Sequence, residues 1–124
     1  FELHINMLMM AELKIQHNNG SNIYVATHGV YDENVFRQIF LVNGITLSGF
    51  YTNRTKDGRV RIEMGNGESN KNIWMAKQFN IKERETTLIV DDSYTIINNA
   101  KVDKFKVLRV NPFYSGENRQ RYQN

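Results

Sequence analysis

The chain of 124 residues contains no cysteine and only one proline, and it has no long apolar run. The absence of cysteine excludes structural disulfides, thiolate zinc sites and cysteine nucleophiles. No segment approaches the roughly 18 apolar residues of a bilayer-spanning helix, so we expect no membrane partner. No basic region followed by a cleavage site is visible near residue 1, so the predicted location is the cytoplasm.

The remaining composition is that of an ordinary globular protein. The formal net charge is +3, 40% of the residues are hydrophobic and 23% are charged, which argues against disordered, collagen-like and coiled-coil classes. A chain of this length predicts one domain, placed at residues 9–112. Residues 1–8 are interpreted as an extension or expression remnant, and residues 113–124 as a mobile basic tail.

Asparagine is abundant, with sixteen residues, and three of them precede a glycine. A coding bias explains the overall count, but the positions of the pairs are informative. Asn19-Gly20 and Asn43-Gly44 lie between apolar runs, a pattern that predicts hairpin turns because asparagine and glycine accept positive φ. Asn66-Gly67 is the third pair.

Short segments rich in β-formers recur between these turn signals, and several alternate apolar and polar residues. The spacing predicts an all-β fold, a small closed or partly open β-barrel of consecutive hairpins, with one short helix near residues 5–16. The sequence shows no internal repeat. The predicted strands are Ile23–Val30, Val35–Val42, Ile45–Asn53, Arg59–Met64, Thr86–Val90, Ser93–Ile97 and Lys104–Val110.

Basic residues gather around one predicted hairpin, with aromatic residues close by in the sequence. Cations that follow phosphates and rings that stack on bases are typical of proteins that bind single-stranded nucleic acid. The alternative is a solvated charged face, because acidic residues dilute the field. The candidate residues are Tyr51, Arg54, Lys56, Arg59, Arg61 and Trp74.

The segment Gln38–Phe50, with its Phe-Leu-Val-Asn-Gly run followed by Leu47, Gly49 and Phe50, resembles the first signature of the bacterial Sm-like (Hfq) family. The resemblance implies a barrel in a homo-oligomeric ring that binds uridine-rich RNA. It also implies pore-side contacts from Lys77 and Gln78, although Gln78 stands where that family has histidine. RNA is therefore the favoured nucleic-acid partner.

A second interpretation is a phage or mobile-element structural or adaptor protein that binds a protein partner. Residues 86–110 look like the closing strands of phage head–tail connector proteins, with an apolar run, an acidic turn and a Tyr-x-Ile step before a last apolar strand. In this case the basic residues are solvated and the strand edges are assembly surfaces.

Catalytic and metal-binding patterns are weak in this sequence. His4, His17 and His28 lack metal-ligand spacing, and a metal site that pairs His28 with a nearby acidic residue is disfavoured. Asp91-Asp92 either binds a cation or forms a tight turn, and the turn is favoured. No nucleophile elbow or phosphate-binding glycine loop is present. We therefore predict a non-enzymatic binding protein with no cofactor and no metal.

Overall fold

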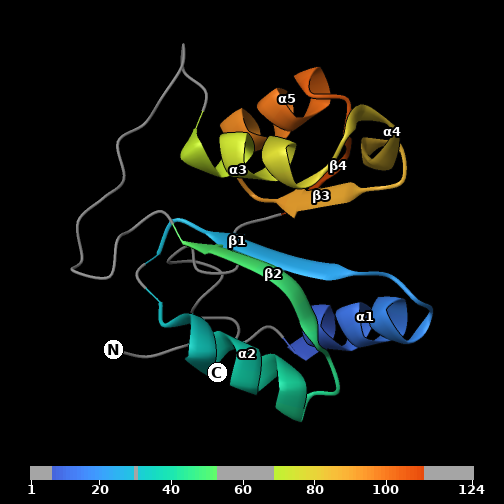
Figure 1. Ribbon diagram of the computed structural model, residues 1–124, viewed down its shortest axis with the longest axis vertical. Coiled ribbons are helices and arrows are strands. Elements are labelled where there is room, and N and C mark those ends of the chain that lie inside the picture. Colours follow the sequence, from blue (N-terminus) through green and yellow to red (C-terminus); the bar gives the residue numbers. More distant parts are fainter. Residues whose placement is uncertain (1–6, 30, 53–68, 111–124) are drawn as a thin grey trace. The chain divides into compact units, whose positions relative to one another are not determined.

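The structure, a computed structural model, describes residues 7–29, 31–52 and 69–110. The chain divides into two compact units, the first ending at Arg61. Within the described residues each unit combines helices with one pair of parallel strands (Figure 1). The predicted all-β barrel is therefore wrong: the fold is mixed α/β, and the described strands form two separate two-stranded sheets.

Unit 1, as far as it is described, runs helix, strand, helix, strand, with both helices on the same side of the strand pair (Figure 1). The strands are parallel, with Ile23 beside Leu47 and Thr27 beside Thr52. Because parallel neighbours need a crossover, a helix joins them. Its elements are α1 (Met7–Asn18), β1 (Ile23–Thr27), α2 (Glu33–Val42) and β2 (Leu47–Thr52), and its buried core is Met10, Ile23, Phe40, Ile45 and Leu47.

The predicted strand Val35–Val42 is helix α2. Asp32 caps it by accepting hydrogen bonds from the N–H groups of Asn34 (2.8 Å) and Val35 (3.3 Å), as N-cap aspartates commonly do. Phe36 and Phe40 lie one helical turn apart and pack on the core. Three further apolar residues off this face are 53% to 76% exposed, and two of them extend Ile39 and Phe40 into an apolar run, Ile39–Val42, that resembles a strand. The three are Val35, Leu41 and Val42.

The first two Asn-Gly pairs reverse the chain, but they end helices instead of closing hairpins. Gly44 has φ +82° and donates to the carbonyl of Leu41 (2.9 Å), while Ile45 donates to that of Phe40 (2.9 Å). This paired pattern is the Schellman motif, which favours glycine at the left-handed position. Gly20, with φ +93°, ends α1 in the same way. Asn66-Gly67 lies outside the described residues.

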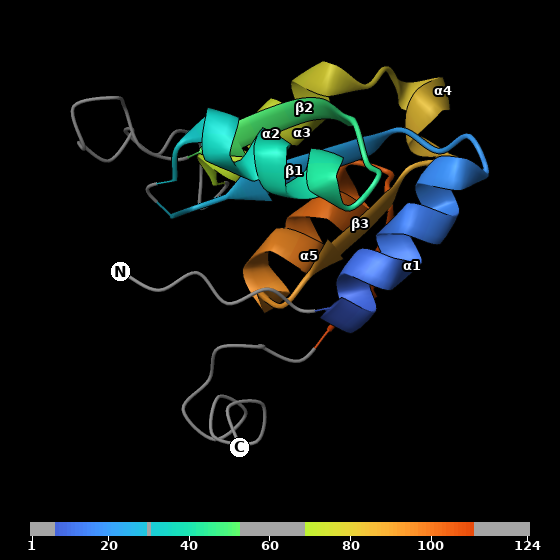
Figure 2. The same cartoon turned by 90° about the horizontal axis from the view of Figure 1, so that it is seen from below.

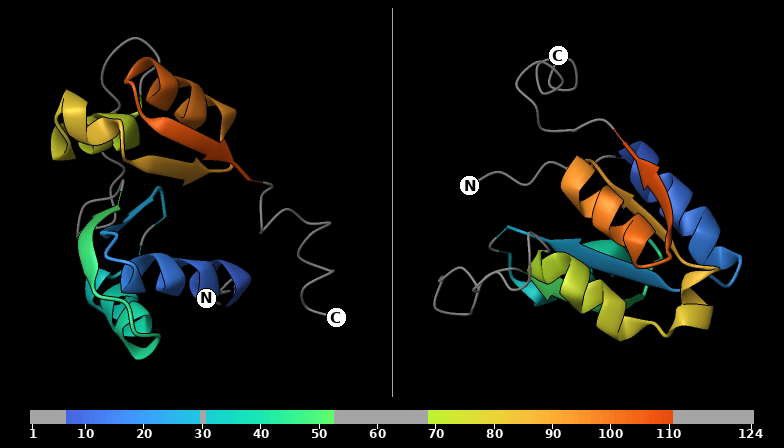
Figure 3. Two further views of the ribbon diagram at one scale, coloured as in Figure 1. Left: turned by 90° about the vertical axis from the view of Figure 1, so that its right-hand side faces the viewer. Right: turned by 90° about the horizontal axis from the view of Figure 1, so that it is seen from above.

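Unit 2 has two helices before its first described strand. Strands β3 and β4 are parallel, with Leu88 beside Lys106 and Asp91 beside Arg109. Helix α5 connects them and covers one face of the pair (Figures 2 and 3). The elements are α3 (Asn70–Gln78), α4 (Ile81–Arg84), β3 (Leu88–Asp91), α5 (Tyr94–Val102) and β4 (Lys106–Arg109).

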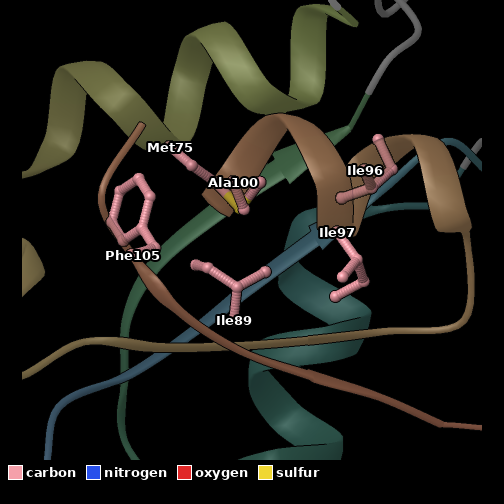
Figure 4. Close-up of a cluster of buried hydrophobic side chains, with 6 residues drawn as sticks. All are labelled: Met75, Ile89, Ile96, Ile97, Ala100 and Phe105. Carbon is pink, nitrogen blue, oxygen red and sulfur yellow. The ribbon is translucent and has the colours of Figure 1, made fainter. Parts of the chain in front are cut away.

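The core of unit 2 lies between α3, α5 and the inner face of the strands (Figure 4). Ile96, Ile97 and Ala100 enter it from α5, with the i, i+1 and i+4 spacing of a helix face. The predicted strand Ser93–Ile97 is therefore wrong. Its β-branched residues suit a strand locally, but the Ser93 cap, which accepts from the Ile96 N–H (3.3 Å), begins a helix. The remaining core residues are Met75, Ile89 and Phe105.

Five of the other predicted segments hold in part. The helix predicted near residues 5–16 is α1, Met7–Asn18. The segments predicted as strands at 23–30, 45–53 and 104–110 contain β1, β2 and β4, and the segment at 86–90 overlaps β3. Their pairing is parallel and not that of hairpins. The predicted strand Arg59–Met64 and the predicted tail 113–124 lie outside the described residues, as do residues 1–6.

Candidate functional site

Half of the predicted nucleic-acid contacts cannot be placed, because Arg54, Lys56, Arg59 and Arg61 lie outside the described residues. Tyr51 is a half-buried residue of β2 in unit 1. The remaining three candidates lie on α3 in unit 2. Tyr51 and these three thus belong to separate units.

The three candidates on α3 differ in their surroundings. Trp74 is partly buried and packs against the core of unit 2, so part of its ring is covered by core residues. Lys77 and Gln78 are exposed in the last turn of the helix. The pore position implied for them depends on a barrel strand, and that strand is absent here because the segment is helical.

Polar residues concentrate instead where β3 ends, an edge that we call the carboxyl edge of unit 2. Asp91 is the last residue of the strand and is 9% exposed. Its Oδ1 accepts the Ser93 N–H (2.9 Å), and Asp92 between them is exposed. The predicted tight turn at Asp91-Asp92 is therefore confirmed, and the turn leads directly into helix α5.

Lys71 makes a buried ion pair with Asp91. Its Nζ lies 2.5 Å from Oδ2 of Asp91, and the two side chains are only 13% and 7% exposed. Burial alone raises the pKa of Asp91, but the hydrogen bond and charge of Lys71 and the Ser93 N–H outweigh it and lower the pKa. Desolvating two charges costs about as much as their attraction returns, so the pair is poorly explained by stability alone.

A buried asparagine fixes the helix turn that carries Lys71. Asn72 is 1% exposed, and its Nδ2 donates to the Ile96 carbonyl on α5 (3.1 Å). Its Oδ1 accepts from the Ser69 hydroxyl (2.7 Å), and its backbone N–H donates to that hydroxyl (3.1 Å). These bonds hold the start of α3 against α5 and so place Lys71 beside Asp91.

The sequence contains a signal for Asp91, one partner of this ion pair, but none for Lys71, the other. An acidic pair directly after the apolar run Leu88–Val90 marks the end of a strand, where polar side chains gather. Lys71 lies 20 residues upstream in the sequence, in a polar stretch with no pattern that singles it out. Only the packing of α3 on α5 brings the two partners together.

Within the described part of the chain, no three His, Cys, Asp or Glu side chains are placed together to hold a metal by themselves. Among the same residues, no helix has the length and apolarity needed to cross a bilayer.

The described residues thus form a mixed α/β protein with parallel strand pairs. A buried ion pair, Lys71–Asp91, lies at the carboxyl edge of unit 2. Comparison with protein-family models, curated proteins and solved structures finds no match. The geometry of the chain itself is therefore what indicates its function.

Proposed function

We propose that unit 2 binds a phosphorylated ligand, together with a divalent cation such as Mg²⁺, at its carboxyl edge. The observation that carries this proposal is the buried Lys71–Asp91 pair. In parallel α/β sheets, ligands bind outside the carboxyl ends of the strands, and this pair lies at the end of β3.

The charges of the edge favour a cation and a phosphate together. Lys71 and Asp91 neutralise each other, and the exposed Asp92 adds one negative charge. A phosphate alone would be repelled by the carboxylates, whereas a divalent cation beside them compensates for both. Mg²⁺ uses one or two protein carboxylates and takes its remaining ligands from phosphate and water, so the Asp92 carboxylate is sufficient as the protein ligand.

Lys71 supplies the protein's positive charge toward the phosphate. An ammonium group is a frequent phosphate partner in proteins, and the N-terminal end of α5, which begins at Tyr94, adds a partial positive charge from its N–H groups. Asp91 holds the Lys71 ammonium in place, and Asp92 faces the cation.

Titration calorimetry with phenyl phosphate tests the proposal. We expect binding in the presence of MgCl₂ and a loss of about tenfold or more when EDTA removes the metal. Lys71→Ala and Asp92→Asn should each weaken binding by about tenfold or more, because each removes a charge-assisted contact. Lys77→Ala, an exposed lysine on the same helix, is the matched control and should change the affinity by less than about twofold.

Folding of the variants must be checked alongside, because Lys71→Ala leaves Asp91 buried without its cation. Asp92→Asn removes an exposed charge, so it retains the fold and keeps the test valid. The proposal is overturned if the wild-type chain does not bind phenyl phosphate with Mg²⁺. It is also overturned if Asp92→Asn and Lys77→Ala bind equally well.

Binding of single-stranded nucleic acid, with RNA favoured, stays a prediction, as does the phage adaptor alternative. Mobility shifts with oligo-U RNA test the first, and affinity should then fall steeply with salt. Lys77→Ala separates the two functions: it should weaken RNA binding and leave phenyl phosphate binding unchanged. The absence of catalysis is likewise a prediction, which turnover of p-nitrophenyl phosphate would refute.

A further inference from the structure

Arg109 lies at the same carboxyl edge as the Lys71–Asp91 pair, but on the neighbouring strand. It is the last residue of β4 and the register partner of Asp91. Ile89 and Val107, two residues earlier on the two strands, both pack on the core of unit 2. Because side chains alternate along a strand, Asp91 and Arg109 point to the α5 side of the sheet.

Arg109 is held by an aromatic ring. Its Cζ lies 3.8 Å from the centre of the Tyr94 ring, a cation–π contact. Tyr94 is the first residue of α5 and is 65% exposed. Its ring therefore supports the guanidinium at the rim of the edge.

One donor of the Arg109 guanidinium lacks a hydrogen-bond acceptor. Within the described residues no carboxylate forms an ion pair with it, and its Nε is buried without a hydrogen-bond partner. Buried donors are nearly always paired, and an unpaired one calls for an explanation, such as a water or an ion that completes it. A planar guanidinium binds phosphate through two parallel N–H donors, which would satisfy this Nε.

We propose that Arg109 binds a second phosphate group of the same ligand, so that unit 2 prefers diphosphates to monophosphates. This inference rests on the proposed phosphate site at Lys71 and Asp91. Arg109 lies on the strand next to Asp91, about 4.8 Å away, and Lys71 contacts Asp91, so both cations lie beside one carboxylate and suit two linked phosphate groups. Tyr94 acts as a positioning residue because it holds the guanidinium flat.

Calorimetry with two probes, inorganic phosphate and pyrophosphate, both with MgCl₂, tests the preference. We expect the wild-type chain to bind pyrophosphate about tenfold or more tightly than phosphate. Arg109→Gln should abolish this ratio and leave phosphate affinity within about twofold of the wild type. Arg109→Lys should restore only part of it, because an ammonium lacks the paired donors.

Two variants of Tyr94 separate a positioning role from a loss of fold. Tyr94→Phe keeps the ring and should retain the pyrophosphate preference, whereas Tyr94→Ala should lower it with phosphate affinity unchanged. The inference is overturned if the wild type binds both probes equally, or if Arg109→Gln weakens both by the same factor. If phosphate binding depends on Lys71 but pyrophosphate binds no more tightly, the inference about Arg109 is refuted and the proposed site at Lys71 stands. Failure of the wild type to bind either probe refutes the proposed Lys71 site and the inference together.

Discussion

Unit 1 and unit 2 build the same strand–helix–strand element from different residues. Helix α2 and helix α5 each begin at a capping side chain, Asp32 or Ser93, and each ends in a Schellman motif. The left-handed position is Gly44 in unit 1 but Lys104, with φ +74°, in unit 2. No repeat is visible in the sequence because backbone geometry, and not side-chain identity, is what the two units share.

The units differ most where their first described strands end. In unit 1, the Thr27 hydroxyl accepts the Gly29 N–H (3.0 Å). In unit 2, the Asp91 carboxylate accepts the Ser93 N–H (2.9 Å) and pairs with Lys71. The local turn is the same, but only the second carries charge. The fold of this edge therefore does not require an ion pair, which favours a binding role for Lys71 and Asp91.

Substitution of these two turn residues should give the largest contrast. Asp91→Ala leaves the Lys71 ammonium buried without a partner, and we expect it to lower the free energy of unfolding by about 3–5 kcal/mol. Thr27→Ala removes one neutral acceptor and should cost about 1 kcal/mol. Urea unfolding of the full chain measures both. Equal losses would show that the ion pair does not distinguish the units.

Two arginines that bind carbonyl groups offer the next contrast. Arg84 donates to the carbonyls of Phe79 (3.0 Å), Asp103 (3.0 Å) and Ala76 (2.7 Å), so Arg84→Met should cost about 3 kcal/mol. Arg37 donates to a single carbonyl, that of Leu47 (2.9 Å), and also forms an exposed pair with Glu33. Arg37→Met should therefore cost about 1 kcal/mol. Similar losses in urea unfolding would contradict this ranking.

The pH dependence of stability should follow Asp91. Its pKa is lower in the folded chain than the ordinary value of 3.8, so the folded state favours the charged carboxylate. Stability from this group is present above the ordinary pKa and is lost as pH falls through the lowered pKa. Thermal stability should therefore be measured as the pH falls below the ordinary value of 3.8. In that range Asp91→Asn should lose less stability than the wild type.

The left-handed positions should give the smallest effects, with opposite signs. Lys104→Gly relieves a side chain at positive φ and should stabilise the chain by about 1 kcal/mol. Gly44→Ala creates the same strain and should destabilise it by about 1 kcal/mol. Thermal melts compare the two. A loss of stability in Lys104→Gly would mean that the Lys104 side chain contributes more than its backbone strain costs.

Local signals in the sequence located much of the chain's secondary structure. The runs of β-formers at Ile23–Val30 and Thr86–Val90 contain strands, and Asn43-Gly44 reverses the chain. What failed was the choice between helix and strand at Val35–Val42. Phe36, Ile39 and Phe40 have the spacing of a helix face, but the exposed apolar residues Val35, Leu41 and Val42 obscure it. The cap at Asp32 is the second signal of a helix.

The candidate site was harder to predict because it is a product of tertiary packing. Asp91 and Asp92 could be found as an acidic turn after an apolar strand, although the turn alone gave no reason to prefer a ligand. Lys71 reaches Asp91 only because Asn72 fastens α3 to α5. A parallel pairing of β3 with β4 was likewise needed to place Arg109 beside Asp91.

Amide chemical shifts measured while phenyl phosphate and MgCl₂ are added to the labelled chain test the central claim most directly. We predict the largest shifts at Lys71, Asp92 and Ser93, on the carboxyl edge of unit 2, and none at Thr27 or Gln78. Shifts centred on Thr27 or Gln78, or no shifts at saturating ligand, would contradict the assignment of a phosphate site to the Lys71–Asp91 pair.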